Sequence, residues 1–113
     1  MCVFRLRMAD VIRDCIIEGV NLFELLWDEA NESHIARHKV TRQEVVEVVF
    51  GAGAIFAVED DHRRGRLLVF GVTATNRHIL VVLDEPTTSG TAYVVTARPM
   101  TARERREYKE VMK

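Results

Sequence analysis

The sequence has few of the residues that mark several common classes of protein. Its 113 residues include two cysteines and two prolines, and aromatic residues make up 7%. Cys2 and Cys15 show no C-x-x-C spacing and no pattern of a disulfide framework or zinc site, so we interpret them as reduced thiols. The longest apolar runs, such as Ile79 to Leu83, span five residues, whereas a membrane helix needs roughly 20 and a signal peptide about 7–15. We therefore expect a cytoplasmic protein without a membrane segment.

An excess of charge of either sign is also missing. The formal net charge is -1 at pH 7, so any binding of nucleic acid would require a local cluster of Arg and Lys. Hydrophobic residues make up 48% and charged residues 29%, a balance that excludes a disordered chain. No G-x-S-x-G, P-loop or Rossmann glycine pattern occurs, which excludes the common serine-hydrolase and nucleotide-binding classes. One domain with one core is expected at this length.

The first half of the chain predicts helices. Residues 1–21 carry apolar residues at helical spacing, and we interpret them as a helical N-terminal extension of a domain over residues 22–113. The run FELLW predicts a short strand, after which Asp28 is a favourable N-cap for a helix that continues to His38. Thr41 then opens a T-x-x-E capping box, and glycines end that second helix. Two short helices joined by a tight corner are therefore expected.

The second half predicts a sheet. Four β-type runs are separated by turn-forming residues, which predicts an antiparallel meander. Thr101 and Glu104 form another capping box, at the start of a charged C-terminal helix. The expected fold class is α/β in the α+β sense, with two N-terminal helices, an antiparallel sheet of about four strands and a C-terminal helix. The four runs are AIFAVE, RLLVFGVTA, RHILVVLDE and TAYVVTAR.

Two arginines are candidate phosphate ligands. If Asp84 pairs near Thr91 in a simple hairpin, Arg77 lies opposite Arg98 on the same face at one end of the sheet. Like charges that face each other are destabilising unless a carboxylate or an anionic ligand lies between them, and the planar Arg head group binds phosphate well. The pattern fits either a phosphate clamp or two solvated arginines at strand ends.

His34 and His38 are spaced four residues apart, which places them on one helix face. This spacing fits a metal-binding pair, an acid–base pair or two residues with structural or capping roles. Ile35 replaces the Glu of an H-E-x-x-H motif, and no third ligand is evident, which argues against a metal site. We therefore expect no metal and no cofactor.

Two further basic clusters are present. Arg63, Arg64 and Arg66 follow three acidic residues, a pattern that also fits a solvated loop whose charges pair with one another. From Arg98 to Lys113, six basic residues exceed three acidic ones, although Glu and Arg at helical spacing often form only surface pairs.

The segments WDEANESHIARHKVTRQEVVEVVFG and TARPMTARERREYKE, with the strand ILVVL between them, resemble the BrnT family over about residues 22–113. The resemblance implies a compact RelE-like ribonuclease toxin of a type II toxin–antitoxin pair. It also implies a small partner antitoxin, BrnA-like and DNA-binding. His38 matches the basic-His position of the family, Arg98 its last-strand arginine, and Arg105 and Tyr108 its closing helix. Many members carry Lys and then Asn in the first helix, where this chain has Asn31 and His34, as in a divergent branch.

The resemblance implies RNA cleavage inhibiting translation, which would need a base for the 2′-hydroxyl, an acid for the leaving 5′-oxygen and cations for the phosphate. We assign proton transfer to His38, with His34 as the alternate, because histidine titrates near neutrality. Arg77 and Arg98 are assigned to the phosphate. The alternative is a non-catalytic module that acts through its antitoxin in control of its operon. In either case we expect a homo-oligomer or a toxin–antitoxin hetero-oligomer. Further RNA contacts are assigned to Arg37, Arg64, Arg66, Arg105 and Tyr108.

Overall fold

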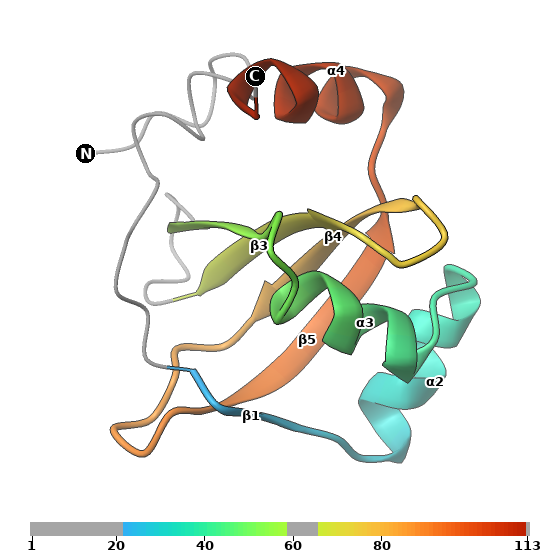
Figure 1. The fold of residues 1–113 in the computed structure, drawn as a ribbon. Helices are drawn as coiled ribbons and strands as arrows, with labels where there is room; N and C mark the ends of the chain where they lie inside the picture. Colours follow the sequence, from blue (N-terminus) through green and yellow to red (C-terminus); the bar gives the residue numbers. More distant parts are fainter. Residues whose placement is uncertain (1–21, 59–65, 113) are drawn as a thin grey trace.

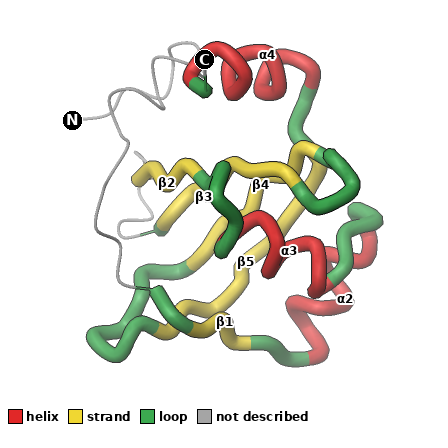
Figure 2. The backbone as a smooth tube through the Cα atoms, viewed as in Figure 1, coloured by secondary structure: helices red, strands yellow, loops and turns green. Residues whose placement is uncertain are grey.

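The computed structural model describes residues 22–58 and 66–112. The predicted N-terminal helix, both cysteines and Arg64 lie outside the described residues. The described chain forms one five-stranded sheet with helices on both of its faces (Figures 1 and 2). Its elements in chain order are β1 (Glu24–Leu26), α2 (Glu29–Arg37), α3 (Arg42–Val49), β2 (Ile55–Val58), β3 (Leu67–Val72), β4 (His78–Leu83), β5 (Thr91–Pro99) and α4 (Ala102–Val111).

The sheet has the strand order β1-β5-β4-β3-β2. The four strands from β2 to β5 pair antiparallel in sequence order, which confirms the predicted meander. β1 adds a fifth strand and pairs in parallel with β5, so the sheet is mixed, whereas the sequence predicted a wholly antiparallel sheet. This parallel pair joins segments more than 60 residues apart, and no local turn signal announces such a contact.

Side-chain caps explain where the helices begin. Asp28, Thr41 and Thr101 are the N-caps of α2, α3 and α4, as the sequence predicted. Asn31 is the partner of Asp28 in a reciprocal capping box, and its side-chain amide also donates to the carbonyls of Leu26 and Val94. With 2% of its surface exposed, Asn31 joins α2 to β1 and β5. Its difference from the family pattern therefore has a structural role.

The corner between α2 and α3 is a Schellman motif. The amide of Lys39 donates to the Ala36 carbonyl, and the amide of Val40 donates to the Ile35 carbonyl. Lys39 is left-handed, with φ 60°, and Val40 and Ile35 are both buried in the core. This motif ends α2 and fixes the position of the neighbouring His38.

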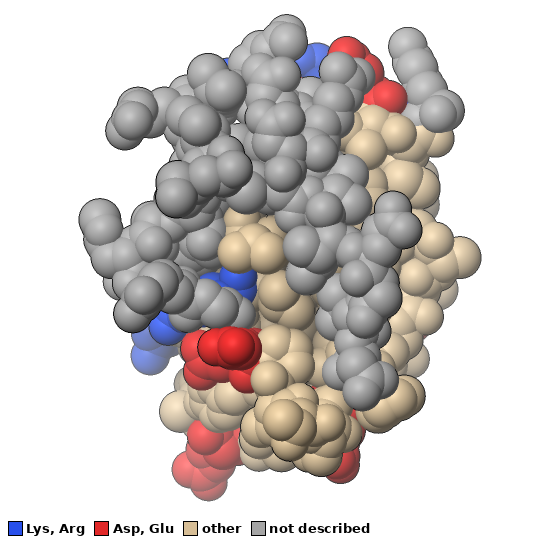
Figure 3. All heavy atoms as spheres, turned by 90° about the vertical axis from the view of Figure 1, so that its left-hand side faces the viewer, with Lys and Arg blue, Asp and Glu red and all other residues tan. Residues whose placement is uncertain are grey.

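Acidic side chains gather at the end of the molecule that holds β1 and the turn between β4 and β5. Figure 3 shows acidic side chains over the lower part of the face turned to the viewer, and also at its top. Glu24 is the first residue of β1 and Asp28 comes shortly after that strand, and Asp84 and Glu85 follow β4. α4, which carries four basic and three acidic side chains, lies at the opposite end in Figure 1.

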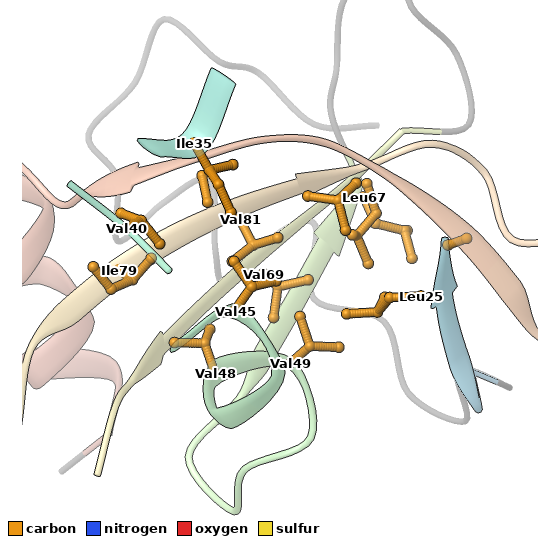
Figure 4. Close-up of a cluster of buried hydrophobic side chains, with 14 residues drawn as sticks. Leu25, Ile35, Val40, Val45, Val48, Val49, Leu67, Val69, Ile79 and Val81 are labelled. Atoms are coloured by element: carbon orange, nitrogen blue, oxygen red, sulfur yellow. The ribbon is translucent and has the colours of Figure 1, made fainter. Parts of the chain in front are cut away.

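The core has one cluster on each face of the sheet. On one face α2 and α3 cover the strands (Figure 4). A Cβ atom at Gly71 would lie 2.9 Å from Val48 Cγ1, so the glycine allows α3 to approach β3 closely. On the other face, α4 packs through Tyr108 against Phe70, Leu80 and Met100. Within the described residues, no helix is long and apolar enough to cross a membrane.

Candidate functional site

His34 and His38 lie together at the C-terminal end of α2. Their rings make an edge-to-face contact with centroids 5.5 Å apart, which confirms that they share one helix face. His34 is half-buried, whereas His38, the C-cap, is exposed. Arg37, the last residue of α2, is exposed beside them. We call this group, with Lys39, the α2–α3 corner.

Arg77, the residue directly before β4, reaches the α2–α3 corner. Its Nη1 atom donates to the Lys39 carbonyl at 2.9 Å and to the two carboxylate oxygens of Glu44 at 2.8 and 2.7 Å. Burial acts to raise the pKa of Glu44, but hydrogen bonds from the Thr41 backbone and from Arg77 outweigh it and hold that pKa below its ordinary value. The charge of Arg77 is therefore balanced by a carboxylate.

Arg98 lies on the opposite face of the sheet, so the predicted pairing of Arg77 with Arg98 is wrong. Arg98 pairs with Leu80, three residues beyond Arg77 in β4. The cause is a wider turn, in which the Asp84 amide bonds to the Tyr93 carbonyl, together with a register shift between Val82 and Leu83. A shift by an odd number of residues moves a side chain to the other face.

A carboxylate also balances Arg98. Its two Nη atoms donate to the two oxygens of Glu104, each at 2.8 Å, and this bidentate pair joins β5 to α4. The hydrogen bond with Glu104 raises the pKa of Arg98. Burial acts against ionisation of Glu104, but its bonds with Arg98 and the Thr101 backbone lower the pKa below the usual value. Neither predicted phosphate ligand is thus an uncompensated cation.

The sequence interpretation missed His78. It follows Arg77 directly, and because neighbouring side chains of a strand alternate, His78 lies on the face that carries α4. Its ring meets the Tyr108 ring edge-to-face, with centroids 5.7 Å apart. Burial, then the charges of Lys109 and Arg105, lower the pKa of His78. The alternation of side chains along the RHILVVL strand could have predicted that Arg77 and His78 lie on opposite faces of the sheet.

The other predicted RNA contacts lie apart. Arg66 pairs with Asp84 at 3.4 Å, at the end of the β3–β4 hairpin remote from Arg77. Tyr108 is 4% exposed and donates its hydroxyl to the Gly53 carbonyl at 2.7 Å, which favours a structural role. Within residues 22–58 and 66–112, no group of three His, Cys, Asp or Glu residues is arranged to hold a metal ion.

A family model described as "Ribonuclease toxin, BrnT, of type II toxin-antitoxin system" matches residues 27–104, which hold the α2–α3 corner and the Arg98–Glu104 pair. This chain belongs to the BrnT family. A search of curated proteins finds no match. Membership confirms the resemblance seen in the sequence, and it implies an antitoxin protein as partner. The BrnT match ends at Glu104, so Arg105 and Tyr108 lie beyond the matched residues.

Proposed function

We propose that this BrnT-family protein cleaves RNA without a metal ion and that the α2–α3 corner carries the reaction. The observation that supports this most directly is the contact of two imidazole rings, 5.5 Å apart, on an accessible helix end. Family membership supplies the reaction class, cleavage of RNA. The two histidines supply imidazole groups, which can accept or donate a proton during the reaction.

In the proposed reaction, the 2′-oxygen of a nucleotide attacks the adjacent phosphorus and the bond to the 5′-oxygen breaks. His38, the more exposed ring, accepts the 2′-hydroxyl proton, and His34 is its alternate. Whichever of the two imidazoles does not act as the base is protonated and donates a proton to the leaving 5′-oxygen. The products are a 2′,3′-cyclic phosphate and a free 5′-hydroxyl, so protons and bonds balance without a water or a metal.

The cations of the corner bind the RNA in this proposal. Arg37 is exposed beside the histidines and is suited to a phosphate contact. Arg77 is 37% exposed at its side chain and holds the corner through Lys39 and Glu44, so we assign it to orienting the site and to contact with the phosphate. Arg98, on the other face, is here a residue that fastens α4.

The test is cleavage of labelled RNA, free or with ribosomes, in EDTA. Cleavage is expected to persist, and His38→Ala is expected to lower its rate by about 10²–10⁴-fold, the usual contribution of a positioned acid–base group. Ser33→Ala, an exposed change on the same helix, is the matched control and should leave the rate unchanged. Loss of activity in EDTA that zinc or manganese restores would contradict the metal-free reaction. Full activity of folded His38→Ala would reject the proposed role of His38.

A second candidate function is a non-catalytic module that acts only through its antitoxin. One observation favours it: Arg77 and Arg98 are both engaged by carboxylates, so neither presents an uncompensated charge. Absence of cleavage with every RNA tested, with and without ribosomes, combined with tight antitoxin binding, would select this function. In either case the partner proposed is a BrnA-like, DNA-binding antitoxin.

A further inference from the structure

Two basic side chains act on His78, and neither is bound by a described carboxylate in the way that Arg77 and Arg98 are. Arg105 and Lys109 of α4 both act on this imidazole, and no carboxylate contributes to the shift of its pKa. Among the ion pairs between described residues, none includes Arg105 or Lys109. Arg105 and Lys109 are therefore cations of this face that have no ion pair with a described carboxylate, unlike Arg98, which is bound by Glu104.

Two hydrogen bonds connect Arg105 to the strand that carries His78. Arg105 Nη1 donates to the Met100 carbonyl at 3.4 Å, and the Met100 amide donates to the His78 carbonyl at 2.9 Å. Tyr108 lies between Arg105 and Lys109 in α4, and its ring contacts the His78 ring. Since residues four apart share a helix face, Arg105 and Lys109 lie on the same side of α4.

We propose that His78, Arg105 and Lys109 form a second binding site, for a phosphate group of single-stranded RNA, on the face of the sheet opposite the α2–α3 corner. The lysine and arginine supply charge, and the imidazole supplies a ring N–H donor. The identity of this ligand as RNA rests on the proposed function. Binding at the site, however, does not require cleavage.

The two sites share one edge of the molecule. Arg77 and His78 are consecutive, yet Arg77 contacts the α2–α3 corner and His78 contacts α4. In Figure 1 the turn between β3 and β4 lies between α4 above and the two other helices below. A single strand can bend over this edge and reach both sites, whereas a stiff duplex cannot follow so sharp a turn. Single-stranded RNA is therefore the expected ligand.

The test is the affinity of the full chain for a fluorescent 2′-O-methyl oligouridine, which cannot be cleaved because its 2′-oxygen is blocked. Lys109→Gln and Arg105→Gln are each expected to weaken binding by about threefold, the share of one phosphate contact, and to reduce the salt slope by about one. His78→Gln should weaken binding without that change in slope. The matched control is Arg103→Gln, on the same helix, because Arg103 is paired with Glu107 instead. It should have a smaller effect.

Equal losses for Arg103→Gln and Lys109→Gln would overturn the site, because they would show only a general effect of charge. If Lys109→Gln and Arg105→Gln leave RNA affinity unchanged but weaken binding of the antitoxin, the site takes a protein carboxylate and the RNA proposal fails. Equal affinity for a duplex of the same length would also contradict it. A wild-type protein that binds the oligonucleotide in this way but cleaves no RNA would reject the proposed function alone.

Discussion

At the residue scale, the ion pair of Arg98 and Glu104 joins β5 to α4. Glu104 is only 9% exposed, accepts two bonds from Arg98 and also bonds to the Thr101 amide. Removal of one partner leaves the other without its counter-charge in a half-buried place, which is costly. The carboxylate therefore holds both the end of β5 and the first turn of α4.

We predict that Glu104→Gln lowers the free energy of unfolding by about 1–3 kcal/mol, because hydrogen bonds to a charged group are lost. The pKa of Glu104 is lowered in the folded protein, so its stabilisation is complete above the ordinary value of 4.5 and is lost as pH falls through the folded pKa. Urea unfolding should show that wild type is more stable than Glu104→Gln at neutral pH and that this difference shrinks in acid. The control is Glu107→Gln, because the Glu107 carboxylate pairs with Arg103 only at 3.8 Å. This variant should lose less stability than Glu104→Gln. Equal losses would contradict the prediction.

At the element scale, local signals predicted well and distant ones did not. The capping boxes at Thr41 and Thr101 depend on residues three apart, and both are present. The register of β4 against β5 depends on a wide turn closed by Thr87 and Gly90, and on the irregularity at Val82. Sequence patterns do not determine such a register, so the placement of Arg98 was wrong while the pairing of the histidines was right.

The stability of the α2–α3 corner can be tested at Lys39. Lys39 adopts φ 60°, a left-handed conformation that costs a side-chain-bearing residue about 1–2 kcal/mol. Lys39→Gly should raise the free energy of unfolding by about 0.5–1 kcal/mol, because glycine at the position after a C-cap avoids this cost. Lys39→Ala removes the same charge but keeps the strain, so it should give no gain. Thermal or urea unfolding of the two variants checks this, and equal stabilities would show that the strain is unimportant.

At the scale of the whole molecule, the arrangement of charge and of helices gives the two sites a common edge. Acidic side chains lie around β1 and the β4–β5 turn, the corner carries Arg37 and Lys39, and α4 carries four basic and three acidic side chains. The sequence predicted both the basic C-terminal helix and the His34–His38 face. It could not predict that Arg77 and His78, neighbours in the chain, serve opposite faces of one sheet, because that depends on which helix packs on which side.

This arrangement predicts how an antitoxin neutralises the protein. A segment that lies across the β3–β4 turn, over residues 73–77, would cover the α2–α3 corner and the His78 site together, and a segment rich in carboxylates would match their charge. In the complex, hydrogen exchange should slow at residues 34–39 and 73–78, where the corner and the turn lie. The effect should weaken when Arg37→Gln and Lys109→Gln are combined, because one cation is removed from each site. A complex that buries only residues 1–21, and leaves exchange at the turn unchanged, would contradict this mode of neutralisation.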